Sequence, residues 1–390
     1  MISVDDALAR IFDLTAPLQS EAVALADAAG RVLTHPVAAT RNQPPFTSSA
    51  MDGYAVIKEE VQPGATFSVI GESAAGHRFS GDVKPGQAVR IFTGAPVPDG
   101  ANRVVIQENV IRTGDQIRLS EYPGTADFVR PAGGDFNIGD ALSAPRRLSP
   151  ADIALLAAMN IAEVSVTRRP QVALIATGDE LVMPGECPGP DQIIASNSFG
   201  LSAMVANEGG QARLLPIARD NVLSLRTAFD LASGADLIVT IGGASVGDHD
   251  IVGNVAGELG MKQSFYKVAM RPGKPLMAGL MGKTMMLGLP GNPVSSLVCG
   301  TVFMLPALRA MLGLGCKPTP RFMARISAPL LANGPREHYM RARMENGQIF
   351  AYDKQDSSLL TVLSDANALL VRDPGDSALK SGDSVEYVPL

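Results

Sequence analysis

In the middle of the chain, short apolar runs alternate with stretches in which apolar residues recur at helical spacing. In chain order we predict strand 172–177, helix 199–208, strand 213–218, helix 221–232, strand 237–241, helix 251–259, strands 276–280 and 285–289, and a long helix from Val294. Gly209 is expected to end the first helix and Asp220 to cap the second. This alternation predicts a doubly wound α/β sheet, whose ligands bind at the carboxyl ends of its strands.

The pattern changes on the amino-terminal side of this sheet. We expect a helix over 3–33, begun by a Ser3 cap with Asp6 and ended at Gly30, and then a proline-rich extended link at 35–45. Short strand-like runs separated by glycines and prolines fill 46–140, which predicts a β-rich region.

Two further elements complete the pattern. A helix over 149–160 should begin with Ser149 as its cap and Pro150 at its first position. From Arg321 onward apolar and polar residues alternate again, with an Asn-Gly turn at 346–347 that is typical of a hairpin. We therefore predict an extended helical and linker domain (1–45 and 141–169), a β-rich domain (46–140), an α/β domain (170–318) and a C-terminal β domain (319–390).

Composition narrows the class of protein. Of 390 residues, 46% are hydrophobic and 18% are charged, as in an ordinary globular protein, and the net charge is −6. Nucleic acid is therefore not an expected partner, because binding to its phosphates needs a basic surface. The three cysteines are widely spaced and form no metal motif, and acidic residues near the amino terminus do not fit a signal peptide, so we expect a cytoplasmic protein.

A membrane alternative arises from the stretch between Lys283 and Arg309, which carries no charge and is long enough to cross a bilayer. Prolines at 290 and 293 divide this stretch into a strand and a shorter helix. We therefore predict that it forms buried core and that the protein does not bind a membrane.

A glycine-rich loop follows the predicted strand 237–241. Glycines let a backbone turn sharply and place its N–H groups close to an anion, and paired aspartates supply oxygen ligands for Mg²⁺. The loop predicts a phosphate cradle beside a cation; the alternative is a glycine-rich turn with solvated aspartates. Its candidate residues are Gly242, Gly243, Ser245, Gly247, Asp248 and Asp250.

Other polar groups are expected at the same edge of the sheet. Glu180 follows the first strand of the α/β region, and Arg271 and Lys274 lie on a stiff Arg-Pro-Gly-Lys-Pro turn. A helix that begins near Pro293 would direct its backbone N–H groups at an anion. The candidates at this helix start are Pro290, Gly291, Asn292, Pro293, Ser295 and Ser296. Each motif alone is also compatible with a purely structural turn.

The β-rich region has three candidates of its own. Asp52 and Thr93 each precede a glycine, and Asp135 follows a glycine pair. Asp-Gly and Gly-Asp are ordinary turn pairs, so these residues gain meaning only from their wider sequence context.

Taken together, these motifs resemble the molybdopterin molybdotransferase family (MoeA-type) and also the E domain of gephyrin. The matching strings span 42–296 in family order and read SAMDGYAV, RIFTGAPVPDGA, the segment 130–135, ATGDEL, Ser-Asn at 196–197, GGASVGDHD, RPGKP and LPGNPVSS. The resemblance implies a molybdopterin-binding α/β domain, a barrel-like C-terminal domain, and an elongated homodimer whose cleft joins the α/β domain of one subunit to the β-rich domain of the other.

The implied reaction is insertion of molybdate into adenylylated molybdopterin with Mg²⁺, which releases AMP and forms molybdenum cofactor. In that reading Glu180, Asp220, Asp248 and Asp250 hold the metal ion or orient water, with Glu180, Asp248 and Asp250 as the metal ligands. Lys274 and Arg271 neutralise an anion, and Asp52, Thr93 and Asp135 face the cleft from the partner subunit. Protein partners would be a molybdopterin adenylyltransferase and the molybdoenzymes that accept the cofactor.

The sequence departs from the family pattern at Ile241, Ala244, Ala195 and the Asn102-Arg103 pair, which bears on loop geometry and metal affinity. One alternative is a relative that shares only the α/β module and adenylylates molybdopterin or hydrolyses a nucleotide pyrophosphate. Another is a non-catalytic scaffold. The context of Asp52, Thr93 and Asp135 argues against the first, and the retained aspartates argue against the second.

Overall fold

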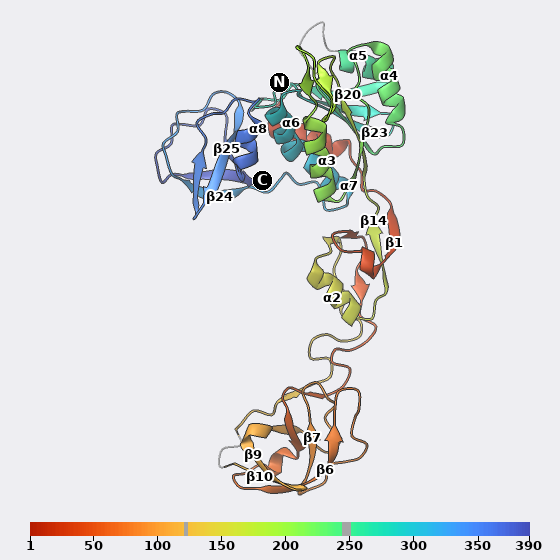
Figure 1. Cartoon of the computed structure of the whole chain (residues 1–390), viewed down its shortest axis with the longest axis vertical. Helices are drawn as coiled ribbons and strands as arrows, with labels where there is room; N and C mark the ends of the chain where they lie inside the picture. Colours follow the sequence, from red (N-terminus) through yellow and green to blue (C-terminus); the bar gives the residue numbers. More distant parts are fainter. Residues whose placement is uncertain (121–123, 244–250) are drawn as a thin grey trace.

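The computed structural model describes residues 1–120, 124–243 and 251–390 of the chain. The molecule is elongated, with a β-rich module at one end, a small connecting region in the middle, and an α/β layer beside a C-terminal barrel at the other end (Figure 1). The chain runs out to the β-rich module and returns, so the connecting region contains two separate segments of sequence.

A mixed sheet of six strands forms the centre of the α/β layer, in the order β18-β15-β19-β23-β22-β20. The first four strands are parallel; β22 then pairs antiparallel with β23, and β20 pairs antiparallel with β22. The strands are β15 (Gln171–Ala176), β18 (Gln211–Leu214), β19 (Leu237–Ile241), β20 (Met261–Tyr266), β22 (Met277–Met281) and β23 (Thr284–Leu289).

Helices cover both faces of this sheet, as a doubly wound fold requires. Val172 and Leu174 share a core with α1, α3 and the long helix α6–α7, whereas Ala173 and Ile175 pack with α4 and α5. Alternate residues of one strand therefore supply two cores. The helices are α1 (Val4–Asp13), α3 (Asn197–Glu208), α4 (Val222–Leu231), α5 (Ile251–Glu258), α6 (Pro293–Cys299) and α7 (Leu305–Met311).

The ends of two helices test the predicted caps. Gly209 adopts a left-handed conformation directly after α3, as expected. Asp220 does not cap α4: the cap is Asn221, whose side chain accepts a hydrogen bond from the Ser224 N–H. The Asp220 N–H instead donates to Asp179 at 3.1 Å. The predicted cap was therefore wrong by one residue, and Asp220 belongs to the loop before the helix.

The apolar stretch near 293–311 forms one long helix, in which a π-helical segment (Gly300–Met304) joins α6 to α7. By length and composition this helix could span a bilayer, but 83% of its apolar window is buried within the fold. It packs in the core that joins the sheet to the barrel. The prediction that this stretch forms core is confirmed.

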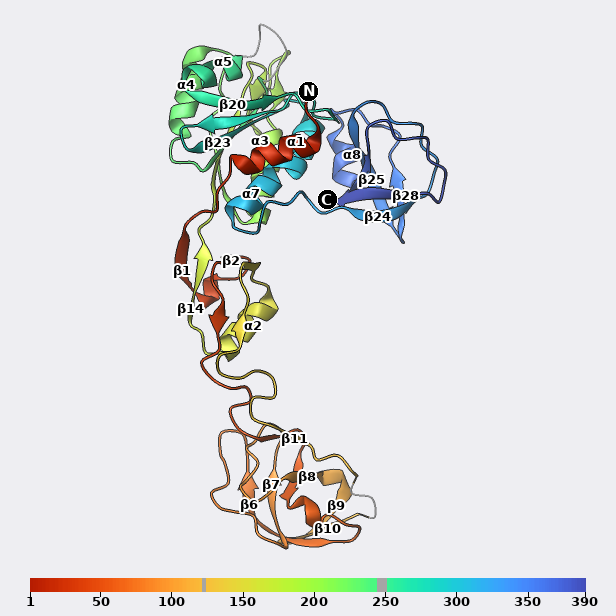
Figure 2. The same ribbon diagram turned by 180° about the vertical axis from the view of Figure 1, so that it is seen from behind.

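The predicted helix over 3–33 is wrong beyond Asp13. The capping box of Ser3 and Asp6 begins α1 as expected, but α1 ends after ten residues. Pro17 lacks the N–H that a helix would need, and the next strand pairs with a distant segment. α1 lies beside α7 (Figure 2) and contributes Val4, Leu8 and Ile11 to the main core.

The connecting region consists of a four-stranded sheet in the order β1-β14-β2-β13, one helix and a strand pair. Ser149 and Asp152 form the predicted capping box of α2, with Pro150 at its first position. The elements are β1 (Ser20–Ala24), β2 (Val32–Leu33), β13 (Arg146–Arg147), β14 (Glu163–Thr167), α2 (Pro150–Ala158), and the pair β3 (Val37–Ala38) and β12 (Ala141–Leu142).

The β-rich module contains a six-stranded sheet in the order β8-β5-β7-β6-β10-β9 and a short pair, β4–β11. Tyr54, Phe67 and Ile117 belong to its separate core. The strands are β4 (Ser48–Ser49), β5 (Gly53–Val56), β6 (Thr66–Ser73), β7 (Gln87–Ile91), β8 (Arg103–Ile106), β9 (Val110–Thr113), β10 (Gln116–Leu119) and β11 (Val129–Arg130).

The C-terminal region closes into a barrel, because β25 pairs with both β26 and β27 at the two ends of the order β25-β26-β24-β28-β27. The predicted turn at Asn346 and Gly347 connects β25 to β26 with positive φ at both residues. The strands are β24 (Phe322–Ile326), β25 (Glu337–Glu345), β26 (Gln348–Ala351), β27 (Ala368–Arg372) and β28 (Ser384–Pro389); a short helix, α8 (Leu360–Asp365), was not predicted.

Candidate functional site

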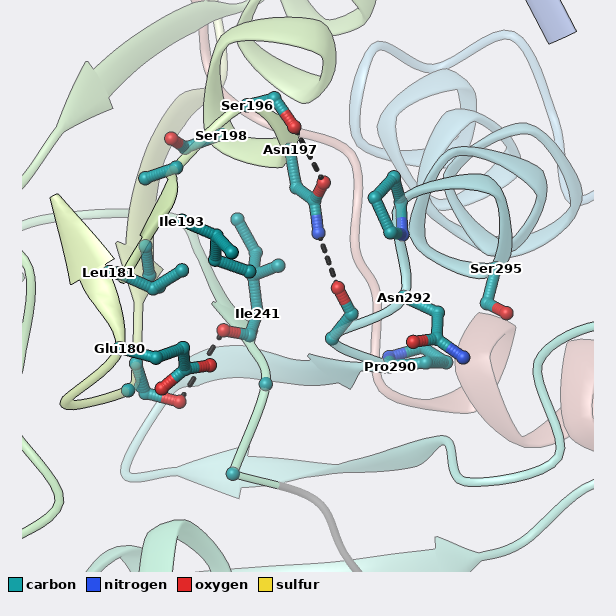
Figure 3. A pocket seen from close by; sticks show the side chains of 18 of the residues that line it. Glu180, Leu181, Ile193, Ser196, Asn197, Ser198, Ile241, Pro290, Asn292 and Ser295 are labelled. Carbon is teal, nitrogen blue, oxygen red and sulfur yellow. Dashed lines mark hydrogen bonds between the residues drawn. The ribbon is translucent and has the colours of Figure 1, made fainter. Parts of the chain in front are cut away.

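A pocket of about 600 Å³ lies at the carboxyl ends of β15, β19 and β23. After β15 the chain passes through α3 and forms β18 on one side of β15; it then passes through α4 and forms β19 on the other side of β15. The strand order reverses at this point, which is where ligands bind in open α/β sheets. Figure 3 shows side chains from several separate segments around the pocket.

Gly242 and Gly243 form the turn at the end of β19, and both line the pocket. Their φ angles are +94° and +65°, which residues other than glycine rarely adopt. A Cβ at Gly242 would lie 2.8 Å from the Thr177 carbonyl oxygen, and one at Gly243 would lie 2.3 Å from a Val252 methyl group. Glycine at both positions therefore lets the backbone turn against β15.

The turn after β23 brings Pro290, Gly291 and Asn292 to the opposite wall of the pocket. The Asn197 side chain donates a hydrogen bond of 2.7 Å to the Gly291 carbonyl oxygen, and the Asn292 side chain donates one of 2.9 Å to Ser357. The turn is thus held between α3 and the C-terminal region. Pro293 and Ser295 also line the pocket at the start of α6.

Ser296 follows in the same helical turn and is fully buried, with a hydroxyl that has no hydrogen-bond partner among the described residues. Ser296 does not line the pocket, in contrast to the prediction that grouped it with Ser295 as a ligand contact. The first turn of a helix places successive side chains about 100° apart, so only one of the two serines can face the cavity.

Two carboxylates line the pocket, Glu180 after β15 and Asp220 before α4. Partial burial and the neighbouring carboxylates of Asp179 and Glu180 raise the pKa of Asp220 above its usual value. The three like charges lie close together and would be stabilised by a cation. Within the described ranges, however, no group of three or more acidic, histidine or cysteine side chains is arranged to hold a metal ion.

The predicted cations do not line the pocket directly. Arg271 and Lys274 are exposed, whereas Pro275 of the same turn reaches the pocket wall. Arg271 belongs to β21 (Met270–Arg271), which pairs in parallel with β25 of the barrel. This turn therefore lies where the α/β layer meets the barrel.

Arg341 of β25 is a buried cation that the sequence analysis did not identify. Its side chain is fully buried, and its Nε and one Nη have no hydrogen-bond partner among the described residues. The other Nη donates to the Asp356 carbonyl oxygen at 3.0 Å, two residues before Ser358, which lines the pocket. Burial and four neighbouring arginines, including Arg271 and Arg341, lower the pKa of His338 to about 4.

Asp52 and Thr93 lie in the β-rich module, at the other end of the molecule from the pocket (Figure 1). Asp135 was predicted to belong to the same region, but it lies in the segment that returns from the module: its N–H donates to the Gln43 carbonyl oxygen at 2.9 Å, and the next residue, Phe136, packs in the core of the connecting region. Asp52 Oδ1 accepts hydrogen bonds from the Thr93 N–H at 2.7 Å and from its hydroxyl at 2.8 Å. These bonds, with the nearby Arg90, lower the pKa of Asp52. Within one chain, the structure therefore brings Asp52 to Thr93 but neither of them to Glu180.

Four predicted site residues lie outside the described residues: Ser245, Gly247, Asp248 and Asp250. Several residues that line the pocket were not predicted. Leu181, Ile193 and Ile194 form an apolar wall from the short strands β16 (Leu181–Val182) and β17 (Ile193–Ile194). The polar additions are Thr177, Ser196, Asn197, Ser198 and Ser358. The Ser-Asn pair at 196–197 was already a motif, and its position before α3 could have indicated a role in the site.

Three family models match successive parts of the chain. The MoeA N-terminal region (domain I and II) matches residues 2–160, a probable molybdopterin binding domain matches 173–310, and the MoeA C-terminal region (domain IV) matches 323–390. The pocket described above lies mainly in the second of these matches.

Two proteins of similar sequence have the same name, molybdopterin molybdenumtransferase. A molybdopterin molybdenumtransferase of Nostoc sp. is 37% identical over 412 residues and aligns with all of this chain and 94% of its own length. The Haemophilus influenzae protein of the same name is 34% identical, with 100% of this chain and 99% of that protein covered.

A solved structure has the same arrangement. The molybdopterin biosynthesis MoeA protein of Pyrococcus horikoshii superposes with a TM-score of 0.86 at 26% identity, and all of both chains is covered. The sequence relatives, the order of family models and this full-length superposition agree: the chain belongs to the MoeA family of molybdopterin molybdenumtransferases.

Proposed function

We propose that the protein inserts molybdate into adenylylated molybdopterin, releasing AMP and forming molybdenum cofactor. The observation that carries this proposal is the pocket at the strand-order reversal, where the Gly242–Gly243 turn, the start of α6 and two carboxylates meet in a chain that aligns with 94% of its Nostoc relative. A phosphorylated substrate would place its anionic groups against backbone N–H groups at the glycine turn and the helix start.

Charge in the pocket supports a role for a divalent cation. Among the described lining residues, the charged ones are Glu180 and Asp220, which are both acidic. An anionic substrate therefore needs a positive charge that these residues do not supply. Oxygen donors suit Mg²⁺, so these side chains fit part of its ligand set, and Asp248 and Asp250 are proposed to add to it. When bound, Mg²⁺ would neutralise charge on the phosphoanhydride.

The cations at the barrel junction complete the proposed site. Arg341, near Ser358, has two buried nitrogens, Nε and Nη1, without a hydrogen-bond partner in the described part of the chain. Burial lowers the pKa of Arg341, and the nearby Arg271 lowers it further. Burying N–H groups of a guanidinium without hydrogen-bond partners costs free energy. We propose that an oxyanion such as molybdate accepts hydrogen bonds from these N–H groups and offsets that cost. Lys274 is proposed to attract the anion from the exposed side of the same turn.

We also propose that the working form is a homodimer in the cytoplasm. Asp52, Thr93 and Asp135 would then face the pocket of the partner subunit, because their distance from the pocket within one chain leaves them no role there. Exchange of substrate and product with a molybdopterin adenylyltransferase and with cofactor-accepting molybdoenzymes belongs to the same proposal.

The test is AMP release from adenylylated molybdopterin by purified protein, with Mg²⁺ and varied molybdate. Molybdate-dependent release with active cofactor formed is the expected result. Tight substrate binding without release would instead favour a scaffold, and release without molybdate would favour an adenylyl-group hydrolase. Omission of Mg²⁺ tests the proposed cation separately, since Mn²⁺ should restore a rate that chelation removes.

A further inference from the structure

We propose that Arg219 is a positioning residue that fixes the loop carrying Glu180 in the pocket. The proposal rests on the function proposed above, because it assigns a role to Glu180 in that reaction. Arg219 directly follows Ala218 and precedes Asp220 in the segment between β18 and α4. It was absent from every motif in the sequence and does not line the pocket itself.

The guanidinium of Arg219 holds the loop by its backbone. Its Nη1 lies 3.4 Å from the Gly178 carbonyl oxygen, 3.0 Å from that of Asp179 and 3.1 Å from that of Leu181. The Glu180 carbonyl oxygen accepts a bond of 2.8 Å from the Ile193 N–H. The four consecutive carbonyl groups from Gly178 to Leu181 therefore all accept hydrogen bonds, and three of them accept from the Arg219 side chain.

Backbone bonds on both sides of Arg219 strengthen this connection. The Gly178 N–H donates to the Ala218 carbonyl oxygen at 3.0 Å, and the Asp220 N–H donates to Asp179 Oδ1 at 3.1 Å. Arg219 thus lies between two bonds that join its own segment to the loop. The segments that carry Asp220 and Glu180 are held together as one unit.

The loop needs this support because its conformation is unusual. Gly178 has a φ of +149°, and the Glu180 carboxylate lies back over it, so that a Cβ at Gly178 would be 2.3 Å from Glu180 Oε2. Asp220 also stands close to Asp179 and Glu180, and like charges repel. A cation that binds the carbonyl side of the loop opposes this repulsion without occupying the pocket.

A double-mutant cycle with Glu180 distinguishes positioning from general stabilisation. We expect Arg219→Gln to lower the kcat of AMP release by about 10-fold to 100-fold with a smaller change in KM, since misplacement of a reacting group by about 1 Å costs this much. In a Glu180→Gln background the same change should cost less than about twofold. Equal losses in both backgrounds, or a wild-type rate for Arg219→Gln, would overturn the proposal.

Two further variants sharpen the test. Arg219→Lys keeps the charge, but its ammonium ends one bond short of the arginine Nη1, so it should remain impaired; full recovery would show that charge alone matters and contradict positioning. Arg226→Gln is the matched control, because among the described residues the side chain of Arg226 on α4 pairs with Glu258 alone, in an exposed ion pair at 2.8 Å. Such pairs contribute little, so this variant should behave as wild type.

Amide hydrogen exchange tests the same contact without any activity. The Ile193 and Asp220 N–H groups should exchange about tenfold faster in Arg219→Gln than in Arg226→Gln, because both donate to the loop. Unchanged exchange would overturn the role of Arg219 even if the enzyme assay failed. A wild-type protein that releases no AMP would instead contradict the proposed function and leave the exchange result to decide on Arg219.

Discussion

Thr93 donates both its backbone N–H and its hydroxyl to the same oxygen of Asp52, at 2.7 and 2.8 Å. Both bonds favour the charged carboxylate and lower its pKa, the backbone bond more than the hydroxyl. Asp52 therefore stays ionised at lower pH than an ordinary aspartate. A half-buried carboxylate held in one orientation and kept charged is suited to contact a substrate or partner group.

We predict that Thr93→Val moves the acid limb of the pH–rate profile to higher pH. The substitution removes one of two bonds to the carboxylate, so the pKa of Asp52 rises and the ionised form is lost sooner as the pH falls. AMP release measured across a pH series would show the shift, and Thr93→Ser should reverse it. Asp52→Asn should lower the rate by about 100-fold or more. If the acid limb stays at the same pH, the ionisation of Asp52 does not determine the acid side of the pH–rate profile.

The separation of Asp52 from Glu180 predicts complementation between subunits. Asp52→Asn and Glu180→Gln should each retain only a small residual rate alone. A mixed dimer of the two would have one intact site and one doubly damaged site. Random mixing makes half of the dimers mixed, so about a quarter of the wild-type rate should return. Subunit exchange must be shown with tagged chains. No recovery after proven exchange would place the whole site within one chain.

Gly242→Ala should distort the backbone turn that lines the pocket. The alanine Cβ would lie 2.8 Å from the Thr177 carbonyl oxygen at a φ of +94°. We expect a loss of about 1–3 kcal/mol in the free energy of unfolding and strongly reduced AMP release. Gly257→Ala in α5 is the control, because no atom lies within 4 Å of its Cβ. It should stabilise the protein by about 0.4–1 kcal/mol. Equal effects of both changes would contradict a special role for the turn.

Ser149→Ala should destabilise the connecting region without affecting the pocket. Loss of this helix cap should cost about 0.5–2 kcal/mol in chemical denaturation. Hydrogen bonds from Ser149 lower the pKa of Asp152, so their stabilisation is present above the ordinary aspartate value of 3.8 and is lost as the pH falls through the lower native value. The difference between Ser149→Ala and wild type should therefore shrink in strong acid. A difference that grows there would contradict this coupling.

Local signals in the sequence predicted the structure well where one residue type has one physical use. Ser3 and Ser149 begin helices, Gly209 ends one, and the Asn346-Gly347 turn connects two strands, all as expected. The failure over 3–33 arose because a helical pattern was extended past Pro17, where strand pairing with a distant segment prevails. Pairing partners far apart in sequence leave no local trace.

The candidate site shows the same division. The turns at Gly242 and Pro290 line the pocket because strand ends in a parallel sheet must meet at one edge. Ser358 and Arg341 were missed because they come from the barrel, whose position against the sheet depends on tertiary packing. Arg341 occurs in an alternating strand, where an arginine usually faces solvent. Arg219 was missed because its contacts are with backbone carbonyls, which every sequence contains.

The two strands that connect the β-rich module to the rest of the molecule have a practical consequence. Ala38 of β3 lies opposite Ala141 of β12 in an antiparallel pair, so the chain leaves and re-enters at neighbouring points. The module is thus inserted into a hairpin and has its own core. Replacing 44–135 by a short Asn-Gly turn between the paired residues Gln43 and Phe136 would give a smaller protein that keeps the pocket and lacks Asp52. Such a protein would separate binding at the pocket from the contribution proposed for Asp52, because ligand binding could be measured with the module removed.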